Sequence, residues 1–476
     1  MRSRSASLGI ALLVSVLGVG CAWFGSGGTP STPSASLEDR LVELADTGFG
    51  RPVRVIWISF SGLEAGDATR ALPWVGRLAA LGVAADDLRV TAPSAVQPAH
   101  ATLVTGRGPA DHGVTGDHPL GDRGVRPEAS VHASQLTGPA LWQEAQQRGL
   151  GVAALDWPGT TGADLPDVLP DLLPLRKGER WPELVADRAT PWLLERVEAA
   201  PVSAWLPGRQ RDAFLVETAC VLLERQRPPA LLMLRLSQAP AVIALAGPGS
   251  ESAKAALARA DAEVGRLLAC ADAAGALEGA AIVVTGDIAW FPAHTAVRPN
   301  VVLAEAGLIV RDSAGVVGWS SLARSNGGSA FVYAESARAA VDARRALTSA
   351  ADATGAFRLV PADEMIELEA DPEAWFGLDA RPGFMFLNGA IGPLLSASPV
   401  RGTSGRLAEE RVGSPAFVAF GQGVRRGVRV PEFDQRDVAP TLAELLGFPL
   451  ERAEGHALIG GFDFKRPAGP VPIGPQ

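Results

Sequence analysis

Lysine is scarce in this sequence, and basic residues form no block. Only three of the 43 basic residues are lysine, and 52 acidic residues bring the net charge to −9. Proteins that bind nucleic acid usually carry a clustered basic patch for the phosphate backbone. The sequence therefore gives no indication of a nucleic-acid partner.

The N-terminus lacks an apolar run long enough to cross a bilayer. Arg2 and Arg4 precede an apolar stretch of 13 residues, Leu8–Gly20. A transmembrane helix needs about 20 such residues. A basic start followed by a short apolar stretch is typical of an export signal that is removed from the mature protein.

The export signal ends at Gly20-Cys21, which resembles a bacterial lipoprotein signal, where the cysteine becomes the lipidated N-terminus. Gly18 stands at the third position before the cysteine, where leucine is usual. A Gly/Ser/Thr/Pro-rich stretch, Gly25–Ser36, follows and is typical of an extended tether. We predict a signal over 1–21 with lipid on Cys21, and a flexible linker over 22–50. An ordinary secretory signal cleaved nearby is the alternative.

Cysteine is equally rare, with two residues left beyond Cys21. Cys220 and Cys270 both lie in apolar patterns with helical spacing. We expect two buried thiols that pack as small hydrophobic side chains. A disulfide is permitted in an exported protein and is the alternative.

The rest of the chain has the composition of a folded domain, with 47% hydrophobic and 20% charged residues. Continuous apolar runs, typical of strands covered on both faces, alternate with helical patterns such as Leu72–Leu81 and Ser252–Ala271. The predicted parallel strands are Val53–Phe60, Gly151–Leu155, Ala230–Leu236, Ala280–Thr285 and Ala416–Phe420. This alternation predicts an α/β sandwich, with a mostly parallel central sheet and helices on both faces.

Three boundaries follow from this pattern. The domain is expected over 51–462, with a tail over 463–476. The segment from about 298 to 399 lacks the regular alternation and is expected to hold an inserted, smaller subdomain.

A series of short motifs follows the predicted strands in a fixed order. They are Ser59-Phe60-Ser61-Gly62-Leu63, Pro93–Val114 (PSAVQPAHATLVTGRGPADHGV), Trp157-Pro158-Gly159, Gly247-Pro248, Thr285-Gly286-Asp287, His294–Ile309, Ser325–Tyr333, Arg401–Gly405 and Asp437–Leu446. This order, from about Arg51 to Gly461, resembles the type I phosphodiesterase/nucleotide pyrophosphatase family of the alkaline phosphatase superfamily.

The resemblance implies an alkaline-phosphatase-like fold and a site with two zinc ions. In such a site a metal-activated threonine attacks phosphorus, and each metal needs about three Asp or His ligands. In this sequence the nucleophile position is Val96. The metal-ligand positions are Ser61, Pro240, Ala244, Asp287, Ile288 and Ser404.

Only Asp287 keeps the residue type that the family chemistry needs. No Asp, Glu or His occurs within 52–63 or 226–249, so shifting the alignment does not restore the missing ligands. A carboxylate cluster without metals is destabilising, and neutral replacements relieve that cost. Asp287 is then a weak, residual metal ligand or, as we favour, a strand-end carboxylate that caps a backbone turn.

Other polar residues offer little chemistry. We expect His100 and His112 to be framework histidines. Ser94 or Thr91 could replace the nucleophile only with a metal or a base nearby. A relocated metal site that adds Asp117, His118 and His294 to Asp287 has no support in their spacing.

The sequence therefore predicts an exported, lipid-anchored pseudo-phosphodiesterase at the cell envelope, without bound metal or other cofactor, that acts by binding or as a scaffold. Its membrane contact is the anchor, and no particular ligand or protein partner is indicated. The alternative is an active metal-dependent phosphodiesterase or phosphatase with a rebuilt metal site and nucleophile.

Overall fold

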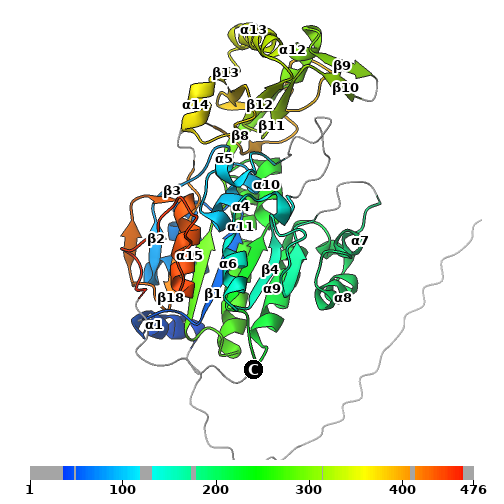
Figure 1. Ribbon diagram of the computed structural model, residues 1–476. Coiled ribbons are helices and arrows are strands. Elements are labelled where there is room, and N and C mark those ends of the chain that lie inside the picture. Colours follow the sequence, from blue (N-terminus) through cyan, green and yellow to red (C-terminus); the bar gives the residue numbers. More distant parts are fainter. Residues whose placement is uncertain are drawn as a thin grey trace, which may run out of the picture. The chain divides into compact units, whose positions relative to one another are not determined.

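A computed structural model describes residues 36–47, 50–117, 131–172, 178–312, 315–407 and 413–464. The signal, Cys21 and His118 lie outside the described residues. An eight-stranded sheet forms the centre, in the order β19-β2-β18-β7-β1-β6-β4-β5 (Figure 1). Its strands are β1 (Arg54–Phe60), β2 (Val83–Ala85), β4 (Val152–Trp157), β5 (Asp167–Pro170), β6 (Leu231–Leu236), β7 (Ala280–Thr285), β18 (Phe417–Gly421) and β19 (Val428–Val430).

The five predicted strands are all present, and four of them are parallel neighbours as expected. The prediction that Ala416–Phe420 is parallel was wrong, because β18 runs antiparallel to both β7 and β2. The chain enters β18 from the edge at which the parallel strands end, so it must run in the opposite direction. A continuous apolar run indicates burial on both faces but not strand direction.

Alternate residues of β1 enter two separate cores, one on each face of the sheet. Ile56, Ile58 and Phe60 contact the core covered by α3, α9 and α11, whereas Val55 and Trp57 contact the core covered by α4, α6 and α15. The predicted helices over 72–81 and 252–271 are α3 and α11. The helices named here are α3 (Pro73–Leu81), α4 (Val96–Thr105), α6 (Leu141–Gln147), α9 (Arg209–Leu223), α11 (Glu251–Ala273) and α15 (Val438–Leu446).

Shorter elements connect these parts. They are α2 (Ala65–Arg70), β3 (Leu88–Arg89), α5 (Pro109–His112), η1 (Ala133–Gln135), α7 (Trp181–Val185), α8 (Pro191–Ala199), η2 (Val202–Ala204), α10 (Gln238–Ala246), β20 (Phe433–Asp434) and η3 (Gln435–Asp437).

The folded domain begins before residue 51. An amphipathic helix, α1 (Leu37–Thr47), buries Leu41 and Leu44 in the core beside α3. Arg40 of this helix lies 3.5 Å from Glu278, just before β7 begins, so α1 packs at the amino ends of the parallel strands. The prediction of a flexible linker over the whole of 22–50 was therefore wrong for this part. Its few apolar residues, spaced at the helical period, went unrecognised in a polar stretch.

Between β7 and β18 lies the segment in which the inserted subdomain was expected. It contains an antiparallel sheet in the order β11-β12-β14-β13, with α12 and α13 packed on one face, and a second sheet around β8. Its elements are β8 (Phe291–Val297), α12 (Pro299–Glu305), β9 (Ile309–Asp312), β10 (Gly315–Trp319), β11 (Ser321–Ser325), β12 (Ser329–Ala334), α13 (Ala337–Thr354), β13 (Phe357–Val360), α14 (Ala362–Glu367), β14 (Phe376–Ala380), β15 (Gly383–Phe386), β16 (Leu395–Ala397) and β17 (Gly402–Thr403).

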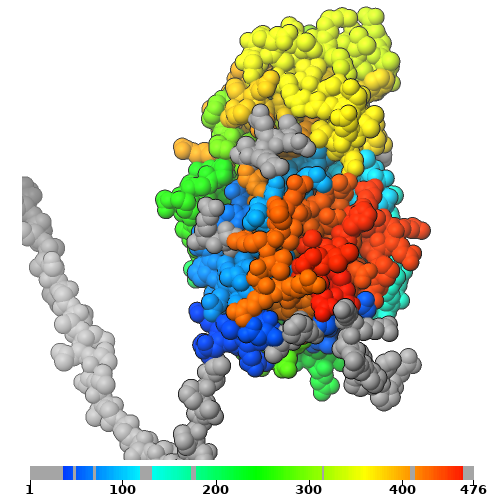
Figure 2. All heavy atoms as spheres, turned by 90° about the vertical axis from the view of Figure 1, so that its left-hand side faces the viewer, coloured from blue at the N-terminus to red at the C-terminus, as the bar shows by residue number. Residues whose placement is uncertain are grey.

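Buried contacts hold this segment against the central domain. Tyr333, the chain's single tyrosine, donates to the Asp371 carboxylate at 2.5 Å, and Thr115 of the central domain donates to the same oxygen at 2.6 Å. Ala92 joins Phe331 and Tyr333 in one apolar cluster. Figure 2 shows the face on which the yellow residues of this segment adjoin the orange and red C-terminal residues.

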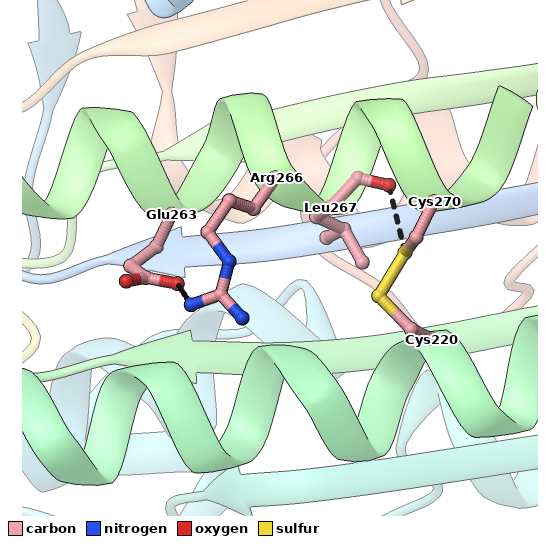
Figure 3. Close-up of a disulfide and its surroundings, with 5 residues drawn as sticks. All are labelled: Cys220, Glu263, Arg266, Leu267 and Cys270. Atoms are coloured by element: carbon pink, nitrogen blue, oxygen red, sulfur yellow. Dashed lines mark hydrogen bonds and ion pairs between the residues drawn. A yellow bond between two sulfur atoms is a disulfide. The ribbon is translucent and has the colours of Figure 1, made fainter. Parts of the chain in front are cut away.

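The two cysteines form a disulfide, so the expectation of two free thiols was wrong. Cys220 of α9 bonds to Cys270 of α11, across 50 residues of sequence (Figure 3). The two helices pack side by side over the same face of the sheet, which brings the cysteines within reach of each other. Neither helical pattern alone indicates its neighbour, so the sequence could not decide between the alternatives.

Within the described residues no helix has the length and apolar character needed to cross a membrane.

Candidate functional site

The seven predicted positions come together at the edge where the parallel strands end. Ser61 follows β1 and Asp287 follows β7, and these strands are neighbours. Pro240 and Ala244 lie on α10, which follows β6, the other neighbour of β1. Contacts of adjoining residues link the remaining positions, Val96, Ile288 and Ser404, to this edge. Ser61, Asp287 and Ile288 are fully buried, whereas Val96, Pro240, Ala244 and Ser404 are partly exposed.

Asp287 is held by groups of the chain itself. One carboxylate oxygen accepts hydrogen bonds from the backbone N–H of Gly62 at 3.2 Å and of Ile288 at 2.9 Å. The other accepts the Ser61 hydroxyl at 2.6 Å. Asp287 thus links the turn after β1 to the turn after β7 in the way a capping carboxylate does.

Arg235 supplies the positive charge beside this carboxylate. It is the only charged residue of β6, and its Nε donates to the Ser61 hydroxyl oxygen at 3.1 Å. A second guanidinium nitrogen lies 4.0 Å from Asp171, which follows β5. Ser61 therefore bridges a buried guanidinium and a buried carboxylate. Sequence reasoning missed Arg235; the available signal was a single arginine within an otherwise apolar strand.

Apolar side chains fill the space next to this network. Gly62 has a φ of +86°, and a Cβ atom there would lie 2.7 Å from Cδ1 of Ile243. Trp290 packs on the same glycine from the other side of the chain, and with Ile288 belongs to the same core as Ile243. The turn after β1 thus favours glycine for its backbone conformation, whereas a side chain there would require the end of Ile243 to shift.

The nucleophile position begins helix α4. Val96 is its first residue, and no side chain of residue 95 caps the helix. Instead the Asp117 carboxylate accepts a hydrogen bond from the backbone N–H of Gln97 at 2.8 Å. This bond satisfies one of the backbone donors that lack a partner within the helix at its start. Asp117 therefore has a structural use here, and Val96 presents only methyl groups at the edge.

His100 lies one turn further along α4 and is fully buried. Its ring nitrogens contact the Ser59 hydroxyl at 2.8 Å and the Val96 carbonyl at 2.9 Å. Burial, together with the nearby charge of Arg235, lowers the pKa of His100 to about 4. It is neutral at pH 7 and serves as a framework residue.

The other candidates are dispersed. His112 is buried against Thr102, and burial lowers its pKa to about 3. Thr91 contacts Gln435, and His294 is on β8, hydrogen-bonded to Thr295. Across the described part of the chain, no three His, Cys, Asp or Glu side chains lie close enough together to hold a metal ion.

Asp212 positions the helix that carries Pro240 and Ala244. Its carboxylate accepts the backbone N–H of Ser237 at 2.9 Å and of Gln238 at 3.2 Å, at the start of α10, and the Gln238 amide at 3.0 Å. Burial, with the charge of Asp156 acting in the same direction, raises the pKa of Asp212 to about 7 against these hydrogen bonds.

Solved structures share this architecture and define its class. Murine ectonucleotide pyrophosphatase/phosphodiesterase 5 matches with a TM-score of 0.61 and 17% identity, over 85% of this chain and 96% of that one. The human protein gives 0.60 and 16%, over 86% and 98%. An inactive form of the murine protein in complex with AMP gives 0.59 and 17%, over 85% and 96%. The fold is alkaline-phosphatase-like.

The sequence assigns the family within that class. A sequence model described as type I phosphodiesterase/nucleotide pyrophosphatase matches residues 55–370. The chain therefore belongs to the type I phosphodiesterase/nucleotide pyrophosphatase family. No curated protein sequence matches it.

The raised pKa of Asp212 predicts a distinctive pH dependence for the Asp212→Asn variant. Between pH 4 and pH 7 the native carboxyl keeps a proton that the unfolded chain has released, so this group makes the protein less stable as the pH rises. Asparagine does not titrate but retains an acceptor. In urea unfolding, the stability of the wild type relative to the variant should fall by up to about 1.4 kcal/mol per pH unit across this range. A difference that stays constant from pH 4.5 to 7.5 would contradict the assignment.

Proposed function

We propose that this chain is a non-catalytic member of its family, a pseudo-phosphodiesterase that acts by binding or as a scaffold. The observation that carries the proposal is the buried chain of contacts from Arg235 through Ser61 to Asp287. The one acidic residue left among the seven positions is occupied by the protein's own donors. A fixed guanidinium lies where an incoming metal cation would be repelled.

The donor set does not fit two zinc ions. Two catalytic zincs need about six protein ligands between them. Of the six metal-ligand positions, Asp287 alone has a strong ligand, and the hydroxyls of Ser61 and Ser404 ligate zinc poorly at neutral pH. Val96 offers no oxygen to attack phosphorus. Metal charge stabilisation and covalent catalysis both lack their residues, so only binding remains.

The proposal is tested by metal content and turnover measured on the same protein. We expect purified protein to contain far less than one zinc per chain. Its turnover of a phosphodiester, a pyrophosphate and a phosphomonoester should not exceed that of Asp287→Ala. Asp287→Asn, which preserves the shape of the side chain, serves as a second control if the alanine variant fails to fold. Val96→Thr should restore no activity, because the metal ligands are still missing.

The opposite outcome would identify the alternative function. Zinc near two per chain, or turnover that is lost in both Asp287 variants, would show an active hydrolase with a rebuilt site.

We further propose that the protein is exported and held at the cell envelope by lipid on Cys21. The basic start, short apolar run, Gly20-Cys21 and polar tether support export. The Cys220–Cys270 disulfide supports it independently, because such bonds persist in oxidising compartments.

A single substitution tests the anchor. Full-length wild-type protein should fractionate with membranes and should carry lipid on Cys21 by mass spectrometry. Cys21→Ser should appear in the soluble exported fraction, whereas Cys220→Ser, which leaves the signal intact, should remain with the membrane. A wild-type protein that is soluble, or whose mature N-terminus is another residue, would rule out the anchor.

A further inference from the structure

A cavity of about 430 Å³ lies beside the candidate site. It is lined by Ser94, two residues before Val96, and by Ala289, which directly follows Ile288. Strand β3, the end of α14 and the segment around η3 form its other walls. None of the seven predicted positions lines it. Its volume is within the range of small-molecule sites in proteins.

Two of the three arginines of this cavity donate hydrogen bonds to carboxylates, whereas Arg406 donates to the Ala380 carbonyl and forms a looser ion pair. Arg89 lies 2.7 Å from Asp434, and Arg436 lies 2.9 Å from Glu369 and 3.1 Å from Asp434. Arg406 lies 3.6 Å from Asp379, with its guanidinium over the Phe291 ring. These guanidiniums are therefore poorly placed to accept an anionic ligand.

The described lining carries more negative than positive charge. It contains five carboxylates and three guanidiniums, a net charge of −2. Glu367 at the end of α14 is exposed at the rim. A cationic group at the rim would offset this charge, whereas a carboxylate or phosphate would be repelled.

The inner wall offers a different chemistry. The Ser94 hydroxyl oxygen accepts the backbone N–H of Ala289 at 3.1 Å, and no acceptor for its hydrogen is found among the described residues. The side chain is 94% buried, since its exposed fraction is 6%. Ala92, Leu407 and Pro415 make the adjoining wall apolar. A ligand that fits has an apolar body with a hydrogen-bond acceptor at its inner end.

We propose that this cavity binds a small organic amine, with its ammonium group toward Glu367 and its acceptor toward Ser94. The ligand site is then displaced from the closed family site to the neighbouring cavity. This binding requires no metal and no residue of the family chemistry. It stands whether or not the chain hydrolyses phosphate esters, so its failure and that of the proposed function are distinguishable.

Three probes of one skeleton test the charge requirement on the full-length protein. Tyramine, the neutral alcohol 4-hydroxyphenylethanol and the anion 4-hydroxyphenylacetate differ only in the group at one end. By isothermal titration calorimetry, tyramine should bind at least tenfold more tightly than the alcohol, and the anion should bind most weakly. Equal affinities, preference for the anion, or no binding of tyramine would overturn the proposal.

Two variants, together with one matched control, test whether tyramine binds in this cavity. Glu367→Lys reverses a charge at the exposed rim and should weaken the binding of tyramine about tenfold. This is the change in Coulomb energy expected when one of two charges about 6 Å apart in water is reversed. Glu198→Lys makes the same change on α8, which does not line the cavity, and should leave the affinity unchanged. Ala289→Trp should block binding by filling the space. Unchanged affinity in Glu367→Lys would place the amine elsewhere, even if Ala289→Trp fails to fold.

Discussion

The buried carboxylate of Asp287 is the constraint on which the rest of the site depends. An ionised carboxyl in the interior must be paired and hydrogen-bonded, or its desolvation is very costly. Here the backbone of two strand-end turns, the Ser61 hydroxyl and the guanidinium of Arg235 meet that need together. The same contacts fix the turns after β1 and β7. Ile243 and Trp290 pack beside Gly62 in the first of these turns.

The strands β1, β6 and β7 end at one edge, because sheet topology places them there. At that edge Asp287 is the one acidic residue among the seven positions, and Arg235 is linked to it through the Ser61 hydroxyl. The inserted segment keeps its own buried contacts with the central domain through Tyr333, Asp371 and Thr115. A cavity is present next to this edge.

The sequence was informative wherever a feature is local. Apolar runs identified β1, β4, β6 and β7, and the order of motifs identified the family. The seven positions were assigned from the resemblance to the family's motifs. Features that depend on partners distant in sequence were missed. The role of Arg235 depends on Ser61 and Asp287, which follow β1 and β7, and the disulfide depends on the packing of α9 on α11. The direction of β18 depends on where the inserted segment returns, which no residue of the strand encodes.

The most direct test of the account is a double-mutant cycle between Arg235 and Asp287, measured by urea unfolding. Arg235→Met and Asp287→Asn each remove one charge while keeping much of the shape, and each should cost about 1–3 kcal/mol because the buried Ser61 hydroxyl loses one of its two charged partners. The double variant should cost clearly less than the two single costs combined, by at least about 1 kcal/mol. The exposed pair Arg338 and Asp342 on α13 is the control and should show almost no coupling. Additive costs at Arg235 and Asp287 would contradict the claim that the guanidinium and the carboxylate are coupled through Ser61.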